Sequence, residues 1–275
     1  MRAKGGYRVT GSGGTALAVY EHGDAAGPEI LFIHGFCQSH RAWDAQTGSA
    51  ALAPFRMVGF DLRGHGASDK PVTRADYDDD RVWADDVAAV VAGAGLRQHI
   101  VEPWSFGGRI VQDYLRCHGT GGIAGVNFVG AALRFANSGE AARGPALAGD
   151  LAADDANVRS AATRKFLRAC YHNQPSDDAF DDAFAYNMIV PAAARRYILE
   201  RAPSIAYAEV LGDLPLLVSH GSADTIMPAA ATRAAAEKLP GARFSLYEGV
   251  GHAVMTEAPE RFSAELVDFV LGITR

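Results

Sequence analysis

The chain has 275 residues, 48% of them hydrophobic, and a formal net charge of −6. This length and hydrophobic content are enough for one large α/β domain with an insertion. The net negative charge and the lack of a basic cluster argue against nucleic acid as a partner. Cys37, Cys117 and Cys170 are odd in number and widely spaced. They therefore disfavour a zinc site or a disulfide framework, and they fit a reducing compartment.

The N-terminal part of the chain predicts neither a targeting segment nor a membrane anchor. Residues 1–6 lead into no apolar stretch that resembles a signal peptide, and no run approaches the length of a membrane span. We therefore expect a soluble, cytoplasmic protein without a membrane partner.

Strand-like and helix-like segments alternate along most of the chain. Residues 7–22 alternate around a glycine-rich run, which predicts an antiparallel hairpin at the edge of a sheet. The alternation of strand-like and helix-like segments along the chain predicts an α/β fold with a mostly parallel, eight-stranded sheet and helices on both faces. Further strands are expected at about 29–33, 57–61, 98–102, 124–129, 215–220 and 243–247, and helices at about 39–53, 79–95, 106–118, 228–239 and 256–273.

Residues 134–205 break this alternation, because they contain no β-rich run. We interpret them as a helical cap inserted into a core made of residues 1–133 and 206–275. Two interpretations of the cap stay open: it covers the site and selects the substrate, or it decorates the surface. Its apolar side chains either line a substrate pocket or form the cap's own core. These side chains are Phe166, Phe180, Phe184, Tyr186, Met188 and Ile189.

A serine at a strand-to-helix corner is the most informative feature of the sequence. An apolar run precedes Ser105, and apolar residues at helical spacing follow it from 109 to 118. Gly107 and Gly108 allow strand and helix to approach closely, and the tight turn forces the serine into strained backbone geometry. The arrangement predicts a nucleophilic serine exposed above the sheet, with an ordinary turn as the alternative.

Two later residues also follow predicted strands. Asp224 lies in the loop after the strand at 215–220, and His252 lies in a glycine-containing loop after the strand at 243–247. Because the carboxyl ends of parallel strands meet at one edge of a sheet, we expect both residues to lie near Ser105. The chain order Ser, Asp, His is that of α/β-hydrolases and differs from the order in chymotrypsin and subtilisin. The three residues therefore predict a catalytic triad.

Over nearly its whole length the chain resembles α/β-hydrolase-fold serine hydrolases. The resemblance is to the branch that contains cofactor-free haloperoxidases (perhydrolases), carboxylesterases and enol-lactone hydrolases. Besides the segments above, it rests on Phe32-Ile33-His34-Gly35-Phe36 and on the run from Phe60 to Pro71. These motifs are specific for the fold and the triad and poorly specific for the substrate. The resemblance places the two donors of an oxyanion hole at the backbone N–H groups of Phe36 and Phe106.

The resemblance implies hydrolysis of carboxylic esters or lactones of small substrates through an acyl-enzyme on Ser105, with perhydrolysis as a side activity. In this reaction His252 acts as general base and acid, and Asp224 orients its imidazole. No metal or organic cofactor is needed, and a homo-oligomer is left open. A triad-bearing receptor with slow turnover and a carbon–carbon bond hydrolase are the alternatives. The resemblance assigns His34 and His65 to loop structure beside the site.

Two residues beside the serine depart from the family pattern. Pro103 stands where the usual motif begins with glycine, and proline removes an N–H. Glu102 replaces an apolar residue on the central strand, where a carboxyl must be paired, hydrogen-bonded or protonated. Its candidate partners are Arg109, His99 and His34. We expect a structural polar contact for Glu102 rather than a catalytic role.

Overall fold

The computed structural model describes residues 4–131, 148–201 and 208–273 of the chain. Its strands are β1 (Lys4–Thr10), β2 (Ala16–Gly23), β3 (Glu29–Ile33), β4 (Arg56–Phe60), β5 (His99–Pro103), β6 (Ile123–Val129), β7 (Leu216–Gly221) and β8 (Arg243–Tyr247). They form one eight-stranded sheet in the order β1-β2-β4-β3-β5-β6-β7-β8. Strand β2 is antiparallel to β1 and β4, and the other neighbouring pairs are parallel. The predicted sheet and its N-terminal hairpin are therefore confirmed.

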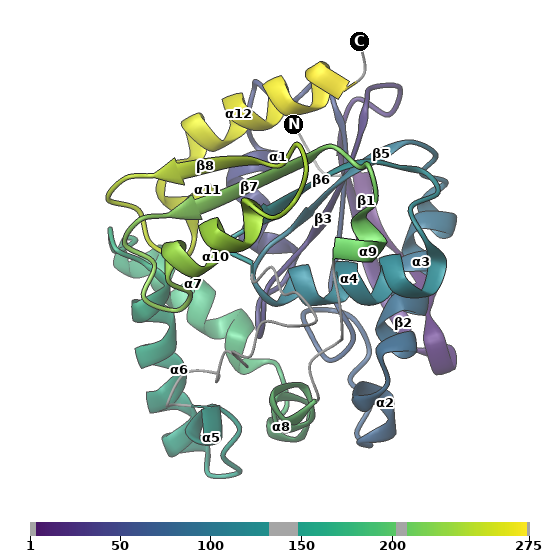
Figure 1. Ribbon diagram of the computed structural model, residues 1–275. Coiled ribbons are helices and arrows are strands. Elements are labelled where there is room, and N and C mark those ends of the chain that lie inside the picture. Colours follow the sequence, from purple (N-terminus) through teal and green to yellow (C-terminus); the bar gives the residue numbers. More distant parts are fainter. Residues whose placement is uncertain (1–3, 132–147, 202–207, 274–275) are drawn as a thin grey trace.

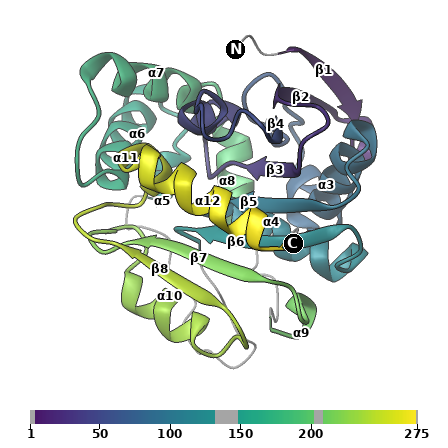
Figure 2. The ribbon, with the colours of Figure 1, turned by 90° about the horizontal axis from the view of Figure 1, so that it is seen from above.

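Helices cover both faces of the sheet (Figure 1 and Figure 2). The longer ones are α3 (Asp80–Ala94), α4 (Phe106–His118), α10 (Ala229–Ala236) and α12 (Pro259–Ile273), and the short ones are η1 (Ser12–Gly14), η2 (His40–Trp43), α1 (Asp44–Thr47), α2 (Ala75–Asp78), α9 (Ala208–Leu211) and α11 (Val254–Glu257). The helix predicted at 256–273 is divided, because Pro259 lacks an N–H and therefore begins a new helix, α12. Within the three described segments, no helix is both long enough and apolar enough to cross a membrane.

The single helix predicted at 39–53 is wrong. The structure has the 3₁₀ turn η2 and the one-turn helix α1, which ends at Gly48. From there to Phe55 the chain continues in hydrogen-bonded reverse turns. Glycine costs a helix about 1 kcal/mol relative to alanine. The buried side chain of Gln46 fixes the short helix instead, because its Nε2 donates to the carbonyl oxygen of Met255 (2.8 Å).

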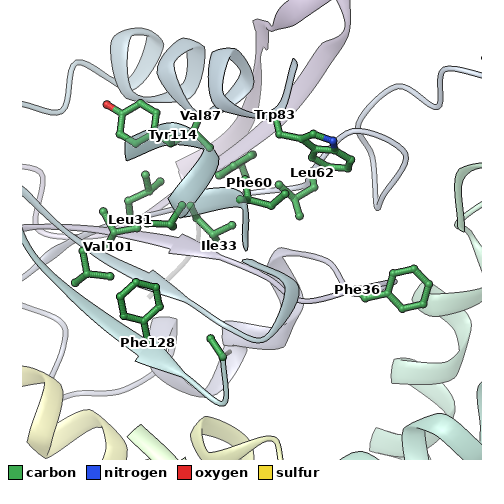
Figure 3. Packing of buried hydrophobic residues seen from close by; sticks show 14 of the residues in the cluster. Leu31, Ile33, Phe36, Phe60, Leu62, Trp83, Val87, Val101, Tyr114 and Phe128 are labelled. Atoms are coloured by element: carbon green, nitrogen blue, oxygen red, sulfur yellow. The ribbon is translucent and has the colours of Figure 1, made fainter. Parts of the chain in front are cut away.

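Apolar side chains fill the space on each side of the sheet. On one face Leu31 and Phe128 of the central strands pack in one cluster with Val87 of α3 and Tyr114 of α4 (Figure 3). On the other face a second cluster joins the sheet to α12. Burial on both faces explains why the strands read as continuous apolar runs in the sequence. Phe36 lies at the edge of the first cluster, apart from the strands (Figure 3).

Four further helices lie together at one end of the molecule, and we call them the cap (Figure 1): α5 (Ala148–Leu151), α6 (Ala156–Cys170), α7 (Asp177–Met188) and α8 (Ala192–Glu200). Arg195 of α8 joins all four. Its buried guanidinium donates to the carbonyl oxygens of Leu151 (3.1 Å) and Asn187 (2.6 Å), and to Thr163 Oγ1 (2.8 Å). These bonds satisfy a charge that is costly to bury. The ends predicted for the cap, 134 and 205, lie outside the described residues.

Candidate active site

Ser105 occupies the corner between β5 and α4. Its backbone has φ 53° and ψ −113°, and a positive φ is strained for a residue with a side chain. Close packing holds this corner. A Cβ atom on Gly107 would lie 2.5 Å from the carbonyl oxygen of Ile33, and one on Gly108 would lie 2.6 Å from Cβ of Ala131. Both positions therefore require glycine, and the predicted strained turn is confirmed.

Pro103 ends β5 without disturbing the sheet. It lies opposite Ile33 in the parallel pairing with β3. The N–H of the next residue, Trp104, donates to the carbonyl oxygen of Ile33 (2.9 Å), and Trp104 also forms a bridge to Val129 of β6. Proline has no N–H to donate to a neighbouring strand, but the pairing with both neighbours continues at Trp104.

The structure brings together the side chains of Ser105, His252 and Asp224. Ser105 Oγ is 2.8 Å from His252 Nε2, and His252 Nδ1 is 2.7 Å from Asp224 Oδ2. A carboxylate only accepts hydrogen bonds, so Nδ1 carries the imidazole proton and Nε2 accepts from the serine hydroxyl. The histidine and aspartate are buried, whereas the serine is partly exposed. This is the arrangement that general-base activation of a serine requires.

Asp224 is held by its own loop and by a second histidine. Its Oδ1 accepts from the backbone N–H groups of Ile226 and Met227, both at 2.8 Å. Nε2 of His220, at the end of β7, donates to the carbonyl oxygen of Met227 (2.7 Å) and lies 3.2 Å from Asp224 Oδ2. Burial raises the pKa of the Asp224 carboxyl. The charge of His252 and the hydrogen bonds of His220 and His252 have a larger effect in the opposite direction, so this pKa lies well below its usual range. Sequence reasoning missed His220, although its place at a strand end, four residues before Asp224, was a usable signal.

The loop that carries His252 is fixed from two sides. The backbone N–H groups of His252 and Ala253 donate to the carbonyl oxygen of Cys170 in the cap, at 2.9 and 3.2 Å. Trp104 Nε1 donates to the carbonyl oxygen of His252 (3.0 Å), and the indole packs against the imidazole. Trp104 therefore does more than fill space: it links the residue before the serine to the histidine.

Glu257 ties the same loop to the end of α6. Its carboxylate accepts hydrogen bonds from the backbone N–H groups of Gly251 (3.0 Å), His172 (3.2 Å) and Asn173 (2.7 Å). Gly251 directly precedes His252, and the other two donors follow the last residue of α6. Hydrogen bonds to an ionised carboxylate are about twice as strong as neutral ones. One side chain thus joins the cap to the histidine loop.

The amides of Phe36 and Phe106 are both available as donors. Phe106 is the first residue of α4, so its N–H has no acceptor within the helix. Across the described segments, neither amide donates to another backbone group. Cys37, which follows Phe36, has a φ of 57°, and its N–H donates to Nε2 of His65 (3.1 Å). This bond fixes the loop that presents the Phe36 amide.

His34 and His65 hold the loops beside the serine as neutral imidazoles. Nε2 of His34 accepts from the backbone N–H of Leu62 (3.0 Å), as Nε2 of His65 does from that of Cys37. In both rings Nδ1 is 2.8 Å from a carbonyl oxygen, to which it donates. Burial lowers the pKa of His34 to about 4 and that of His65 to about 3. A second proton on either ring would lie on Nε2 and would point at the backbone N–H from which this nitrogen accepts, so the hydrogen bond would be lost.

The prediction that Arg109, His99 or His34 pairs with Glu102 is wrong. Oε2 of Glu102 accepts from Nδ2 of Asn127 (2.9 Å). The register between β5 and β6 shifts after His99, and this shift brings Asn127 beside Glu102. Oε1 has no partner among the described residues, and burial raises the pKa of the carboxyl well above its usual value. Glu102 therefore makes a structural contact, as expected, but with a partner on the neighbouring strand.

A small cavity at the serine adjoins a larger one. The smaller, of about 10 Å³, is lined by Ser105 and His252, and we call it the serine cavity. The larger, of about 220 Å³, is lined by residues of η2, α1 and α7, and we call it the side cavity. Gln38 and Trp104 line both. The two cavities are therefore neighbours that share part of their walls.

The sequence left two roles open for the apolar residues of the cap: to line a pocket or to form the cap's own core. In the structure some of these residues line a cavity and others do not. Phe166 lines the serine cavity and packs edge-on against Phe36, with 6.2 Å between ring centroids. Tyr186 lines the side cavity. Phe180, Phe184, Met188 and Ile189 line neither. The cap thus contributes to both cavities with only part of its apolar surface.

The sheet order, the serine corner and the strand-end residues define a known class of protein. The chain belongs to the α/β hydrolase fold family, whose model matches residues 28–259. The family resemblance noted in the sequence is therefore confirmed.

Three similar proteins are informative. A crystal structure from Burkholderia cenocepacia, provisionally classed as an aryl esterase, is 34% identical, with a TM-score of 0.90 over 98% of this chain and 100% of that one. An esterase from Rhodococcus sp. ECU1013 is 31% identical, with a TM-score of 0.85 over 98% of this chain and 99% of that one. A non-heme haloperoxidase from Rhodococcus erythropolis is 28% identical over 95% of this chain and 98% of its own length.

Proposed function

We propose that the protein is a serine hydrolase that cleaves carboxylic esters or lactones of small substrates through an acyl-enzyme on Ser105. The observation that carries the proposal is the hydrogen-bonded series Ser105, His252 and Asp224, with distances of 2.8 and 2.7 Å, at a strained strand-to-helix corner. The similarity to two esterases at 34% and 31% identity supports the same reaction.

In the proposed mechanism, His252 Nε2 takes the proton of Ser105 Oγ while the oxygen attacks the ester carbonyl carbon. The imidazolium that forms is stabilised by Asp224, which stays ionised because its pKa is low. The imidazolium then gives its proton to the leaving alcohol. Water, activated by the same histidine, attacks the acyl-enzyme and releases the acid and the free serine. The chemistry uses no group outside the chain other than water.

The amides of Phe36 and Phe106 form the proposed oxyanion hole. Their N–H groups stabilise the negative charge that develops on the carbonyl oxygen as the serine attacks. Loss of one such donor costs about 3–4 kcal/mol of transition-state stabilisation. The hydrogen bond from Cys37 to His65 matters for the same reason, because it fixes the loop that carries one donor.

Perhydrolysis is the second proposed activity, with hydrogen peroxide replacing water as the attacking nucleophile and a peracid leaving. The similarity to a non-heme haloperoxidase supports this activity. The free thiols of Cys37, Cys117 and Cys170 agree with the proposed location in the cytoplasm.

Covalent labelling tests the nucleophile directly. A fluorophosphonate is expected to add once to the wild-type chain, at Ser105, and not to the Ser105→Ala variant. Ser12→Ala is the matched control, because Ser12 is also partly exposed but lies in the turn between β1 and β2. Labelling that persists in Ser105→Ala would contradict the assignment.

Turnover of p-nitrophenyl acetate separates an enzyme from a receptor that keeps the same three residues. The enzyme is expected to release many equivalents of p-nitrophenol per chain, with a burst when deacylation is slow. A receptor releases one equivalent in one slow event. Peracid formation is measured in parallel with hydrogen peroxide present.

A further inference from the structure

Gln38 is a buried polar residue without a complete set of partners. The residue is 2% exposed, and its Oε1 has no hydrogen-bond donor within the described residues. A buried carbonyl oxygen left without a donor costs about 1–3 kcal/mol. Gln38 lines both the serine cavity and the side cavity, two residues after the proposed oxyanion donor Phe36. Its position therefore suits an acceptor for a hydrogen-bond donor that a substrate brings.

The side cavity has the size and lining of a site for an aromatic group. Its volume of about 220 Å³ exceeds the roughly 150 Å³ of an apolar cavity that holds benzene. A phenyl ring therefore fits, with space left for part of a linker. Trp104, Tyr171 and Tyr186 line the cavity, and aromatic rings bind other rings by stacking or edge contacts.

The charges at the side cavity favour a neutral ligand. Arg41, Asp44 and Asp182 line it, which gives one positive and two negative charges and a sum of −1. The Arg41 guanidinium is already engaged, since it donates to Asp182 (3.0 Å) and to Asp44 (3.4 Å). A substrate carboxylate would meet a net negative wall without a free cation among the residues that line the cavity.

We propose that the side cavity binds an uncharged arylalkyl group of the substrate, and that Gln38 Oε1 accepts a hydrogen bond from a hydroxyl within two carbons of the ester. The proposal rests on the proposed esterase function. Because Gln38 is shared by the two cavities, the hydroxyl lies close to the ester, while the ring lies beyond it, against Tyr171 and Tyr186, which line only the side cavity. The same chemistry fits a hydroxylated acyl part or a hydroxylated alcohol part of the ester.

Matched substrates test the hydrogen bond and distinguish the two parts. Methyl mandelate and methyl phenylacetate differ only by a hydroxyl on the acyl side, and 2-hydroxy-2-phenylethyl acetate and 2-phenylethyl acetate differ only by one on the alcohol side. Each kcat/KM value is corrected for the intrinsic reactivity of its ester, measured as the hydroxide-catalysed rate. In at least one pair, the corrected kcat/KM is expected to be higher for the hydroxylated ester by roughly tenfold or more. In Gln38→Met, which keeps the length of the side chain without its amide, this preference is expected to fall to within about twofold.

Filling the side cavity tests the place of the ring. Ala179→Leu narrows the cavity, whereas Ala185→Leu makes the same change on the same helix, at a position that is exposed like Ala179 but lies outside the cavity lining. Ala179→Leu is expected to lower kcat/KM for methyl mandelate at least fivefold while changing that for methyl lactate less than twofold. Ala185→Leu is expected to change neither.

Two results overturn the inference. One is that the wild-type enzyme hydrolyses the two esters of each pair with corrected kcat/KM values within twofold of each other. This result does not depend on the folding of any variant. The other is a hydroxyl preference that persists unchanged in a folded Gln38→Met variant. Failure of the proposed function looks different, because then neither these esters nor p-nitrophenyl acetate is hydrolysed and Ser105 is not labelled.

Discussion

The carbonyl oxygen of Cys170, at the end of α6, accepts a hydrogen bond from the backbone N–H of His252 (2.9 Å), so a helix of the cap fixes the position of the histidine. One residue earlier, the carbonyl oxygen of Ala169 accepts from Oγ1 of Thr225, which follows Asp224 (3.0 Å). The last turn of α6 therefore contacts the loops of two of the three proposed catalytic residues. Changes in the cap are expected to alter the rate of the reaction as well as the choice of substrate.

Glu257→Gln tests this link. Each carboxylate oxygen of Glu257 accepts two hydrogen bonds, Oε1 from the N–H groups of Gly251 and His172 and Oε2 from the N–H and Nδ2 of Asn173. The glutamine keeps one acceptor oxygen but turns an NH₂ group toward the other pair of donors, so two of the four hydrogen bonds are lost. With p-nitrophenyl acetate, kcat is expected to fall about three- to tenfold, with a smaller change in KM. Glu260→Gln is the matched control, since Glu260 is exposed on α12. Equal kinetics in the two variants would show that the histidine loop keeps its position without Glu257.

Asp224→Asn tests the acid that orients the histidine. The amide keeps the shape of the side chain but can present an NH₂ group to His252 Nδ1, which favours the wrong imidazole tautomer. We expect kcat to fall by roughly 10⁴ while the fold is kept. Steady-state kinetics and a thermal melt measure the two effects separately. A near-normal rate would mean that another acid orients His252.

His65 predicts a loss of stability in acid. Its pKa in the folded protein is about 3, against 6.5 for the free side chain, so on acidification the unfolded state binds the proton first. The free energy of unfolding therefore falls as the pH drops from about 6.5 toward 3, by about 1.4 kcal/mol per pH unit for this residue. Urea denaturation of wild type and His65→Asn between pH 7 and 5 is expected to show a shallower slope in the variant. Equal slopes of unfolding free energy against pH in the two proteins would contradict the prediction. The raised pKa of Glu102 changes stability with pH in the opposite direction, but Glu102 is present in both proteins and therefore does not affect the comparison.

Tyr186 and Phe184 separate lining residues from packing residues within one helix. Tyr186 lines the side cavity, whereas the ring of Phe184 stacks under the guanidinium of Arg164, 4.0 Å from its centroid. Tyr186→Ala is expected to shift the preference among acyl groups by about 1–3 kcal/mol in kcat/KM ratios. Phe184→Ala is expected to leave the ratios unchanged and lower only the melting temperature. A substrate panel from acetate to phenylacetate esters measures both.

The sequence was sufficient to predict the sheet and to place Ser105, Asp224 and His252 together. Each of these residues follows an apolar strand, and parallel topology alone brings strand ends to one edge. The strain at Ser105 was predictable for a similar reason, because the two glycines after it show that strand and helix pack closely.

The partners of buried polar groups could not be predicted in this way. The contact between Glu102 and Asn127 depends on a shift of register between β5 and β6, which no local pattern encodes. The same holds for Glu257, whose carboxylate meets backbone groups 84 and 85 residues away in sequence. Helical periodicity also failed at 39–53, where the tertiary contact of Gln46 stabilises a single turn.

The hydrogen bond between Ser105 and His252 joins residues 147 positions apart in the chain. Loops of this length close late in folding, since their entropy must be lost before the contact stabilises the protein. During synthesis on the ribosome, β5 and the serine corner emerge well before the strand that leads to the histidine. The proposed nucleophile Ser105 therefore has no His252 to accept its proton until the loop after β8 is in place, so the proposed ester hydrolysis requires the chain to be made through that loop.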